Sequence, residues 1–315
     1  MGPLPHEKEI EETEKTIEHL KKQNLKNPLF TKEIKKLEEK LGVLKTQVYK
    51  NLTPWERIQI SRHPLRPHSI DYIENLTDDF HELSGDRLYG DDHALIGGIG
   101  EIQGIKCVLI GQEKGNDTES RIYRNFGMMN PEGFRKALRL MKLAEKFKLP
   151  VVSFLDTPGA NPVLEAEERG QGGAIAMNLR EMAALKVPIL VIVIGEGCSG
   201  GALGIGVGDR VGMLEHSYYS VISPEGCASI LYKDSSKKES SAEALKLTSE
   251  ELLSRGVIDK VIKEPLGGAH QDKALMIDNV KAFITEEILP LQKLSVDELL
   301  ERRYQKFRKI GEVFG

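Results

Sequence analysis

Cysteine is scarce in this sequence of 315 residues. Its three cysteines, Cys107, Cys198 and Cys227, include no C-x-x-C pair. This pattern argues against a disulfide framework and against a cysteine zinc site within the chain. A small, odd number of thiols fits a reducing compartment, so we expect a cytoplasmic protein.

An excess of positive charge and a long apolar run are also missing. Lys and Arg number 44 against 48 Asp and Glu, which gives a formal charge of −4. Nucleic acid is therefore not expected as the main partner, since phosphates require a basic face. The most apolar strand-like run covers only residues 189–194, far short of a membrane span. The charged N-terminus has no apolar segment, so no signal peptide is expected.

Residues 7–50 differ in character from the rest of the chain. They are rich in Glu and Lys, and two apolar stripes with helical spacing are separated by Asn27 and Pro28. The stronger stripe alternates steps of three and four residues: Ile34, Leu37, Leu41, Leu44 and Val48. This spacing predicts a helical hairpin within an N-terminal arm, residues 1–52. Its stripes pack either on the rest of the chain or against an oligomer or partner subunit.

From about residue 95 the pattern becomes α/β, within a domain predicted to span residues 53–315. Apolar, β-branched runs predict buried strands at residues 106–110, 151–155, 189–194 and 219–222. Helical patterns lie at residues 131–148 and 168–185, and the polar stretch 233–241 is predicted to be a surface loop. Ser295 and Glu298 form a capping box that predicts a last helix.

The glycine-rich segment 194–206 matches more than one motif. Gly195, Gly197 and Gly200 fit a dinucleotide-binding G-x-G-x-x-G, with Glu215 near the position of a ribose acid. The candidate helix is short and contains further glycines, which disfavours this interpretation. An Asp-x-x-Gly sequence at residues 156–159 is like that of a GTPase switch, but no Gly-Lys pair supplies a phosphate loop.

The same glycine segment also fits a serine nucleophile elbow, Gly197-x-Ser199-x-Gly201. A triad would require the chain order Ser199, Asp259 and His270, and His270 lies in no obvious turn after a strand.

The remaining interpretation is that Gly200 and Gly201 present backbone N–H groups to a developing oxyanion. Two small residues let a planar ligand approach the main chain, and a helix beginning there adds its positive end. The alternative is that these glycines only permit tight packing of a strand against a helix.

Several longer segments, taken together, resemble the alpha subunits of bacterial acetyl-coenzyme A carboxylase carboxyltransferases. The resemblance extends from the N-terminal arm to residues 302–307, and the segments that carry it are 85–87, 96–98, 124–128, 131–139, 156–160, 167–171, 195–202, 219–226 and 264–270. Residues 247–252 and 256–259 also look like the late segment of crotonase-fold proteins.

The resemblance implies a crotonase-like ββα spiral with an N-terminal helical hairpin and C-terminal helices. It implies a subunit that moves the carboxyl group of carboxybiotin, delivered on a carrier protein, to acetyl-coenzyme A (acetyl-CoA). The product is malonyl-CoA, in the first committed step of fatty acid synthesis. The partners implied are a zinc-ribbon beta subunit in an α2β2 assembly, the biotin carboxyl carrier protein and an ATP-dependent biotin carboxylase. Any zinc is expected on the beta subunit, so this chain itself would hold no metal.

By this resemblance the carboxyl transfer needs no protein nucleophile, because biotin itself acts as the base. Gly200 and Gly201 would be the backbone oxyanion donors. The carboxybiotin side would include Gly159, Ala160, Gly197, Ser199 and Ala202. Lys114 and Arg124, with Arg121, are candidates to meet coenzyme phosphates; a solvated basic face is the alternative.

A few positions depart from the family pattern: Asn161, Val163, Gly172, Gly173 and Cys198. They concern the detailed shape of the biotin pocket and leave Gly200 and Gly201 untouched. Cys198 is expected to pack rather than react. Residues 167–169 are expected to begin a helix, where they either cap it or bridge to the beta subunit, and the capping role is favoured. The alternatives from other classes are a homomeric crotonase-type acyl-CoA hydratase or isomerase, a biotin-dependent decarboxylase subunit, and a scaffold subunit without chemistry of its own.

Overall fold

The computed structural model describes residues 4–25 and 30–311. Within these residues one mixed sheet has the order β1-β2-β3-β4-β5-β6-β8, and β7 pairs with the end of β5. From β3 to β8 neighbouring strands run parallel, whereas β1 and β2 pair antiparallel at one edge. The strands are β1 (His81–Glu82), β2 (Leu95–Ile102), β3 (Ile105–Gln112), β4 (Val151–Thr157), β5 (Ile189–Cys198), β6 (Arg210–Leu214), β7 (Tyr218–Ser220) and β8 (Lys260–Ile262).

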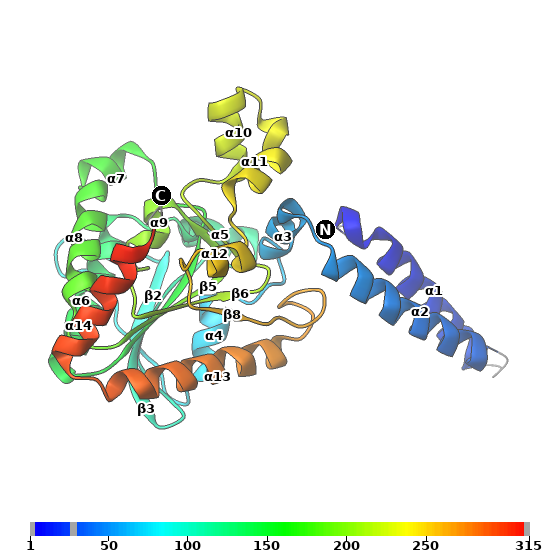
Figure 1. Ribbon diagram of the computed structural model, residues 1–315, viewed down its shortest axis with the longest axis horizontal. Helices are drawn as coiled ribbons and strands as arrows, with labels where there is room; N and C mark the ends of the chain where they lie inside the picture. Colours follow the sequence, from blue (N-terminus) through cyan, green and yellow to red (C-terminus); the bar gives the residue numbers. More distant parts are fainter. Residues whose placement is uncertain (1–3, 26–29, 312–315) are drawn as a thin grey trace.

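Helices surround this sheet and form the arm (Figure 1). The α-helices are α1 (Lys8–Asn24), α2 (Thr31–Lys50), α3 (Pro54–Ser61), α4 (Ser69–Leu76), α5 (Thr118–Tyr123), α6 (Pro131–Phe147), α7 (Leu164–Glu168), α8 (Gln171–Ala184), α9 (Ser199–Leu203), α10 (Pro224–Tyr232), α11 (Lys238–Leu245), α12 (Ser249–Ser254), α13 (Lys273–Gln292) and α14 (Val296–Lys309). Short 3₁₀ turns are η1 (Pro5–Glu7), η2 (Asn125–Gly127) and η3 (Ser235–Lys237).

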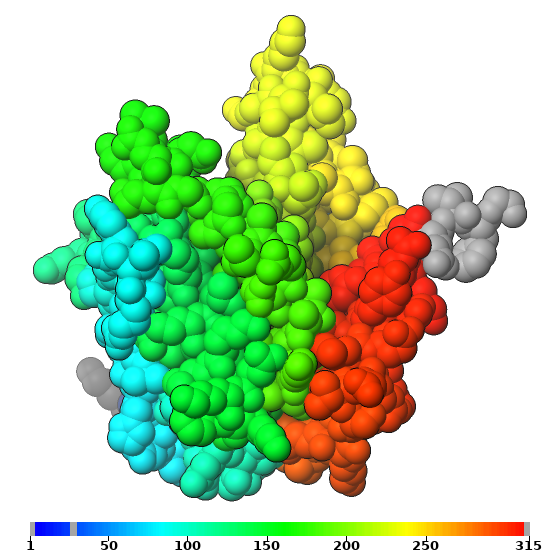
Figure 2. Space-filling model, turned by 90° about the vertical axis from the view of Figure 1, so that its left-hand side faces the viewer, coloured from blue at the N-terminus to red at the C-terminus, as the bar shows by residue number. Residues whose placement is uncertain are grey.

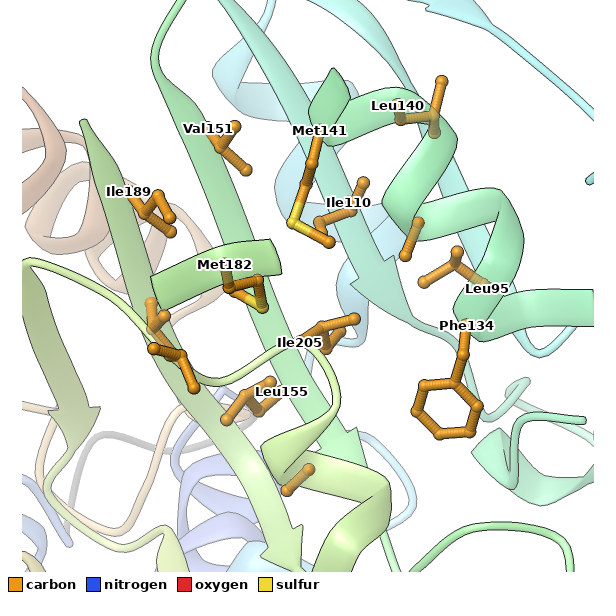
Figure 3. Packing of buried hydrophobic residues seen from close by; sticks show 14 of the residues in the cluster. Leu95, Ile110, Phe134, Leu140, Met141, Val151, Leu155, Met182, Ile189 and Ile205 are labelled. Atoms are coloured by element: carbon orange, nitrogen blue, oxygen red, sulfur yellow. The ribbon is translucent and has the colours of Figure 1, made fainter. Parts of the chain in front are cut away.

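The central strands are mostly apolar because both faces of the sheet are covered, and the charged residues Asp156 and Glu196 stand only near their carboxyl ends. Along β3, Val108 and Ile110 pack on the side of α6 and α8, whereas Cys107 and Leu109 pack on the side of α4 and α13. Figure 3 shows the first of these cores, where side chains of α6 and α8 meet those of β3, β4 and β5. The crotonase-like α/β class and the buried strands predicted at residues 106–110, 151–155 and 189–194 are confirmed. The strand predicted at 219–222 is wrong in part, because β7 ends at Ser220 and Val221 is 77% exposed.

The N-terminal hairpin is observed as well. Helices α1 and α2 lie side by side and project from the domain (Figure 1). Ile10, Ile17 and Ile34 are buried along the hairpin, and Tyr49 Oη donates to Glu7 Oε1 at 2.7 Å near its base. The predicted break at Asn27 and Pro28 lies outside the described residues. The hairpin's role as an oligomer or partner contact stays a prediction.

The last helix begins as predicted, since the N–H of Glu298 donates to Ser295 Oγ at 3.2 Å. Arg303 then anchors this helix to the domain. Its buried guanidinium pairs with Asp209 at 2.7 Å and donates to the carbonyls of Met182, Leu185 and Val187. The C-terminal helices are therefore part of the domain's packing.

Three local predictions were wrong. The single helix expected at residues 168–185 is divided into α7 and α8, because Gly170 adopts φ +86° between them. Residues 167–169 accordingly end α7 rather than begin a helix. The predicted loop 233–241 is largely helical, in η3 and the start of α11, with Asp234 capping η3. Polarity predicted its exposure correctly, but Lys and Ser are compatible with a helix on a surface.

The helices α10 and α11 (yellow) stand out from the surface, and the region of α7 (green) forms a second projection beside them (Figure 2). The surface is hollowed between the two. In the parts of the chain described here, no helix combines the length and the apolar character needed to span a membrane.

Candidate active site

The predicted Gly200–Gly201 turn begins helix α9, directly after β5. The first N–H groups of a helix have no partner within it, which leaves those of Gly200 and Gly201 outside the helical ladder. The Gly200 carbonyl accepts from the N–H of Gly204 at 2.9 Å, which holds the peptide between Gly200 and Gly201 in place. Both glycine N–H groups are thus directed away from the helix body.

The two glycines have opposite surroundings. A Cβ at Gly201 would overlap the peptide that joins Gly159 to Ala160 and would lie 2.9 Å from Gly159 Cα. A Cβ at Gly200 would meet only Ile175, at 3.7 Å. The structure therefore brings four of the predicted residues together, with Gly201 closed against the Gly159–Ala160 turn and Gly200 beside open space.

Three other predicted residues lie in or next to this turn but face differently. Gly197 is buried in β5, where a Cβ would approach the Tyr219 ring to 2.9 Å. Ala202 is fully buried in the core between the sheet and α6. Ser199 is half-buried, with φ +60°, at the first position of α9. Substrate contact by these three stays a prediction, and packing accounts for Gly197 and Ala202.

The facing turn is held in shape by Thr157. Its Oγ1 donates to the Gly159 carbonyl at 2.6 Å and accepts from the Gly159 N–H at 3.1 Å. Farther along, Asn161 donates to Asn130 Oδ1 at 2.9 Å, so its side chain is turned toward the start of α6. The next departure from the family pattern, Val163, is 44% exposed before α7.

A buried ion-pair cluster lies at the same strand ends, around Lys114. Its Nζ lies 2.7 Å from Asp156 Oδ1 and 2.6 Å from Glu196 Oε1. Arg62 Nε lies 2.7 Å from Glu196 Oε2, to which the hydroxyl of Tyr218 also donates at 2.6 Å. We call these five residues the Lys114 cluster.

Electrostatics keep the carboxylates of the Lys114 cluster ionised. Burial alone would raise the pKa of Glu196, but the charges of Lys114 and Arg62 outweigh it and lower that pKa to about 2. Burial would also raise the pKa of Asp156, but the charge of Lys114 and the hydrogen bond with His68 outweigh burial and hold that pKa well below its usual range. Burial would lower the pKa of Lys114, but the two carboxylates outweigh burial and raise it.

A polar cavity of about 260 Å³ adjoins the Lys114 cluster. Its lining includes Arg62, His68, Lys114, Arg121 and Pro158. His68 Nδ1 lies 3.1 Å from Asp156 Oδ2. Of the basic residues predicted to meet coenzyme phosphates, Lys114 and Arg121 line this cavity, and Lys114 is already paired with two carboxylates.

The third candidate for a phosphate contact, Arg124, lies outside this cavity lining. It donates to the His93 carbonyl at 3.0 Å, and its guanidinium lies 5.9 Å from the centre of the Tyr123 ring. Phosphate binding by Lys114 and Arg124 stays a prediction.

The other interpretations of the glycine segment fit the structure less well. Asp259 pairs with Lys306, and His270 stacks on His63 with 3.7 Å between ring centroids, so neither residue serves Ser199. Helix α9 has only five residues, far shorter than a pyrophosphate-binding helix. Cys198 is buried against Ile58 and Tyr218, and burial raises the pKa of its thiol to about 11, which agrees with packing.

The sequence interpretation missed two sets of residues. Asp156 and Glu196 lie in segments that attract notice for their glycines. Their shared partner, Lys114, is predicted from the sequence only as a contact of coenzyme phosphates, not as the partner of these carboxylates. Gln112 was not considered at all, although it is fully buried at the end of β3. Its only signal is a polar residue at the end of an apolar run. In the portion of the chain with described side chains, no group of three or more His, Cys, Asp or Glu residues is placed to hold a metal ion.

Comparisons with known proteins bear on the fold and the family of this chain. Solved structures with the same fold include a Pseudomonas malonate decarboxylase hetero-tetramer in complex with coenzyme A (TM-score 0.59, 16% identity, 75% of this chain and 92% of that one). Another is the transcarboxylase 12S core (TM-score 0.55, 19% identity, 70% of this chain and 42% of that one). At these identities they establish the fold alone.

Sequence relatives are much closer. An acetyl-coenzyme A carboxylase carboxyl transferase subunit alpha from Protochlamydia amoebophila is 64% identical over 99% of both chains. The protein of the same name from Chlamydia pneumoniae is 61% identical over 99% of this chain and 96% of its own. The family model described as acetyl co-enzyme A carboxylase carboxyltransferase-like matches residues 3–311. The chain therefore belongs to the acetyl-coenzyme A carboxylase carboxyltransferase family.

Proposed function

We propose that this chain is the alpha subunit of an acetyl-CoA carboxylase carboxyltransferase. It moves the carboxyl group from carboxybiotin on a carrier protein to acetyl-CoA, which gives malonyl-CoA for fatty acid synthesis. In this proposal the chain acts in the cytoplasm as α2β2 with a zinc-ribbon beta subunit. A biotin carboxylase recharges the carrier in an ATP-dependent step. Family membership and the names of the full-length relatives support the assignment.

The observation that carries the proposal is the pair of facing backbone turns. Gly200 is half-buried beside open space, so a flat ring has room to approach the main chain there. At Gly201 the two turns are too close for any side chain. These residues fit the carboxybiotin end of the reaction. When bound, carboxybiotin supplies the activated carboxyl group and a carbonyl oxygen on which negative charge develops.

This chain's contribution is then electrostatic. The N–H groups of Gly200 and Gly201, at the positive end of α9, would donate to that oxygen. Fixed backbone donors need no reorientation during the reaction, and removing one typically costs ~10²–10³ in rate. The half-buried Gly159–Ala160 turn would form the opposite wall. The remaining assignments, Gly197, Ser199 and Ala202 near carboxybiotin and Lys114 and Arg124 near coenzyme phosphates, belong to the same proposal.

The division of labour along the chain is also part of the proposal. The arm, residues 1–52, would contact a partner or second copy, and residues 53–315 would form the carboxyltransferase domain. The arm projects from the domain (Figure 1), and only a small hydrophobic cluster that includes Tyr49, Leu52 and Ile60 lies at its base. This geometry agrees with the division.

The test is reconstitution. The chain is co-expressed with a zinc-ribbon beta subunit, and malonyl-CoA formation is measured from acetyl-CoA and a carboxylated biotin carrier. We expect activity from the complex and none from this chain alone. Gly201→Ala in the complex should lower kcat by ~10²–10³ through loss of the donor geometry.

The control is Gly90→Ala, since a Cβ at Gly90 meets nothing within 4 Å. Circular dichroism and co-purification verify that each variant folds and assembles. Full activity of Gly201→Ala would identify a scaffold subunit instead. Hydration of enoyl-CoA by this chain alone, without biotin, would identify a homomeric hydratase. Net loss of carbon dioxide from malonyl-CoA would identify a decarboxylase subunit.

A further inference from the structure

Gln112 joins the two facing turns through a single side chain. It is the last residue of β3 and is fully buried. Its Nε2 donates to the Gly201 carbonyl at 2.7 Å, and its Oε1 accepts from the Asp156 N–H at 3.2 Å. One bond reaches the start of α9, and the other reaches the strand end from which the Gly159–Ala160 turn follows.

The orientation of this amide is determined by its neighbours. Asp156 offers an N–H and Gly201 offers a carbonyl oxygen. A flipped amide would place its NH2 group against the Asp156 N–H and its oxygen against the Gly201 carbonyl, and both hydrogen bonds would be lost. The backbone of Gln112 is fixed too, because its carbonyl accepts from Ser69 Oγ at 2.6 Å. A primary amide donates and accepts across one rigid plane, and it thereby sets the separation of the groups it joins.

We propose that Gln112 is a positioning residue for carboxyl transfer. Its side-chain amide holds the Gly201 carbonyl, and with it the start of α9, at a fixed distance from the strand end that carries the Gly159–Ala160 turn. Gln112 does not touch the reacting atoms itself. The inference rests on the proposed function, since it assumes that the two turns together bind the carboxybiotin end of the reaction. Small displacements of such donors are costly, because 1 Å of misplacement can lower a rate ~10²-fold.

Two variants separate positioning from general stability. Gln112→Met keeps the length of the side chain and removes both hydrogen bonds, so kcat of the reconstituted complex should fall ~10²-fold. Gln112→Glu keeps the acceptor but sets a carboxylate against the Gly201 carbonyl. Burial and the nearby Asp156 charge raise the pKa of such a carboxyl. When protonated, it donates as the amide does, so the ratio of its kcat to that of the wild type should rise as the pH falls.

The control is Ser249→Ala in α12. Ser249 is fully buried, and its Oγ donates to the Glu215 carbonyl at 2.8 Å. Its loss should lower the melting temperature, with kcat near that of the wild type. Hydrogen exchange gives a readout independent of activity. The N–H groups of Gly204, Ile205 and Gly206 donate to carbonyls of α9, and we expect these three amides to exchange faster in Gln112→Met.

The outcomes are distinguishable. A pH-independent ratio for Gln112→Glu, with unchanged exchange of the amides 204–206 in Gln112→Met, overturns the positioning role while the wild-type complex still makes malonyl-CoA. Equal losses of kcat in Gln112→Met and Ser249→Ala also overturn it. A wild-type complex that makes no malonyl-CoA overturns the proposed function, and the role of Gln112 in that reaction with it.

Discussion

The Gly200–Gly201 turn and the Lys114 cluster adjoin the ends of the same parallel strands, but they are built from different groups. The turn offers main-chain N–H groups and faces another backbone turn. The cluster consists of charged and hydroxyl side chains, and each carboxylate in it has a cationic partner. Backbone donors carry no ionisable proton, so the turn is suited to stabilising charge on a ligand rather than to transferring protons.

The charged groups of the Lys114 cluster, in contrast, already pair with one another within the protein. Lys114 lies between two carboxylates, so a coenzyme phosphate that met Lys114 would compete with them. The difference indicates that the turn offers its donors to a ligand, while the ion pairs of the cluster hold the strand ends that carry the turn. Each of the following variants tests one side of this contrast.

The largest effect is expected from Lys114→Met. The change leaves Asp156 and Glu196 buried without their shared cation, which should lower the free energy of unfolding by about 3–5 kcal/mol. Urea unfolding followed by circular dichroism measures it. Lys106→Met, at an exposed position of β3, the strand that ends two residues before Lys114, is the control. A loss below about 1 kcal/mol, the size of a surface pair, would show that the cluster is not a structural clamp.

The next largest effect on the free energy of unfolding is expected from acid, which should weaken the same cluster. The folded pKa of Glu196 is about 2, against a reference of 4.5. Because the folded pKa is the lower one, the contribution is present above pH 4.5 and is lost as the pH falls toward 2. A shift of this size corresponds to about 3 kcal/mol. Unfolding free energies measured across this window should therefore decline.

Glu196→Gln isolates this contribution. It should make the decline shallower, because its amide does not titrate, while Asp86 and Glu264, whose pKa values are also lowered to about 2, account for the rest. Glu74→Gln, at an exposed position, is the control and should leave the curve unchanged. If Glu196→Gln keeps the full decline, other carboxylates of the fold cause the acid sensitivity.

How much of the fold could be predicted depends on the kind of signal each element left in the sequence. The core strands were predictable because residues 107–110, 151–155 and 189–194 are almost continuously apolar, as expected for a sheet covered on both faces. Strand β2 left no such signal. It contains Gly97, Gly98 and Gly100, and a Cβ at Gly98 would overlap the His81 backbone. Glycine is depleted in strands by propensity, yet here the close approach of β1 demands it.

The candidate site divides in the same way. The backbone turns were predictable because glycines adjacent in sequence make them. The Lys114 cluster was not, since Arg62 and Glu196 are 134 residues apart and meet only after the sheet has formed. Gln112 and Gly201 are 89 residues apart, and periodicity cannot report such a bond. Long-range polar contacts leave no local pattern, so the structure was needed to find them.

The smallest effect on stability is expected from Gly200→Ala. In the middle of a helix Gly is less stable than Ala by about 0.5–1 kcal/mol, and Gly200 is the second residue of α9. Ile175 at 3.7 Å leaves room for the methyl group, so the free energy of unfolding should rise by at most about 1 kcal/mol. If Gly200 faces the ligand, the same methyl group occupies the approach to the main chain, so KM for the carboxylated carrier should increase.

Gly200→Ala thus separates the two explanations for this glycine. Glycine kept only for packing would make the variant neutral in steady-state kinetics. Glycine kept for access to the backbone would make it more stable and poorer at binding the carrier, a combination that packing alone does not produce. Urea unfolding and steady-state kinetics on the same reconstituted preparation decide between them.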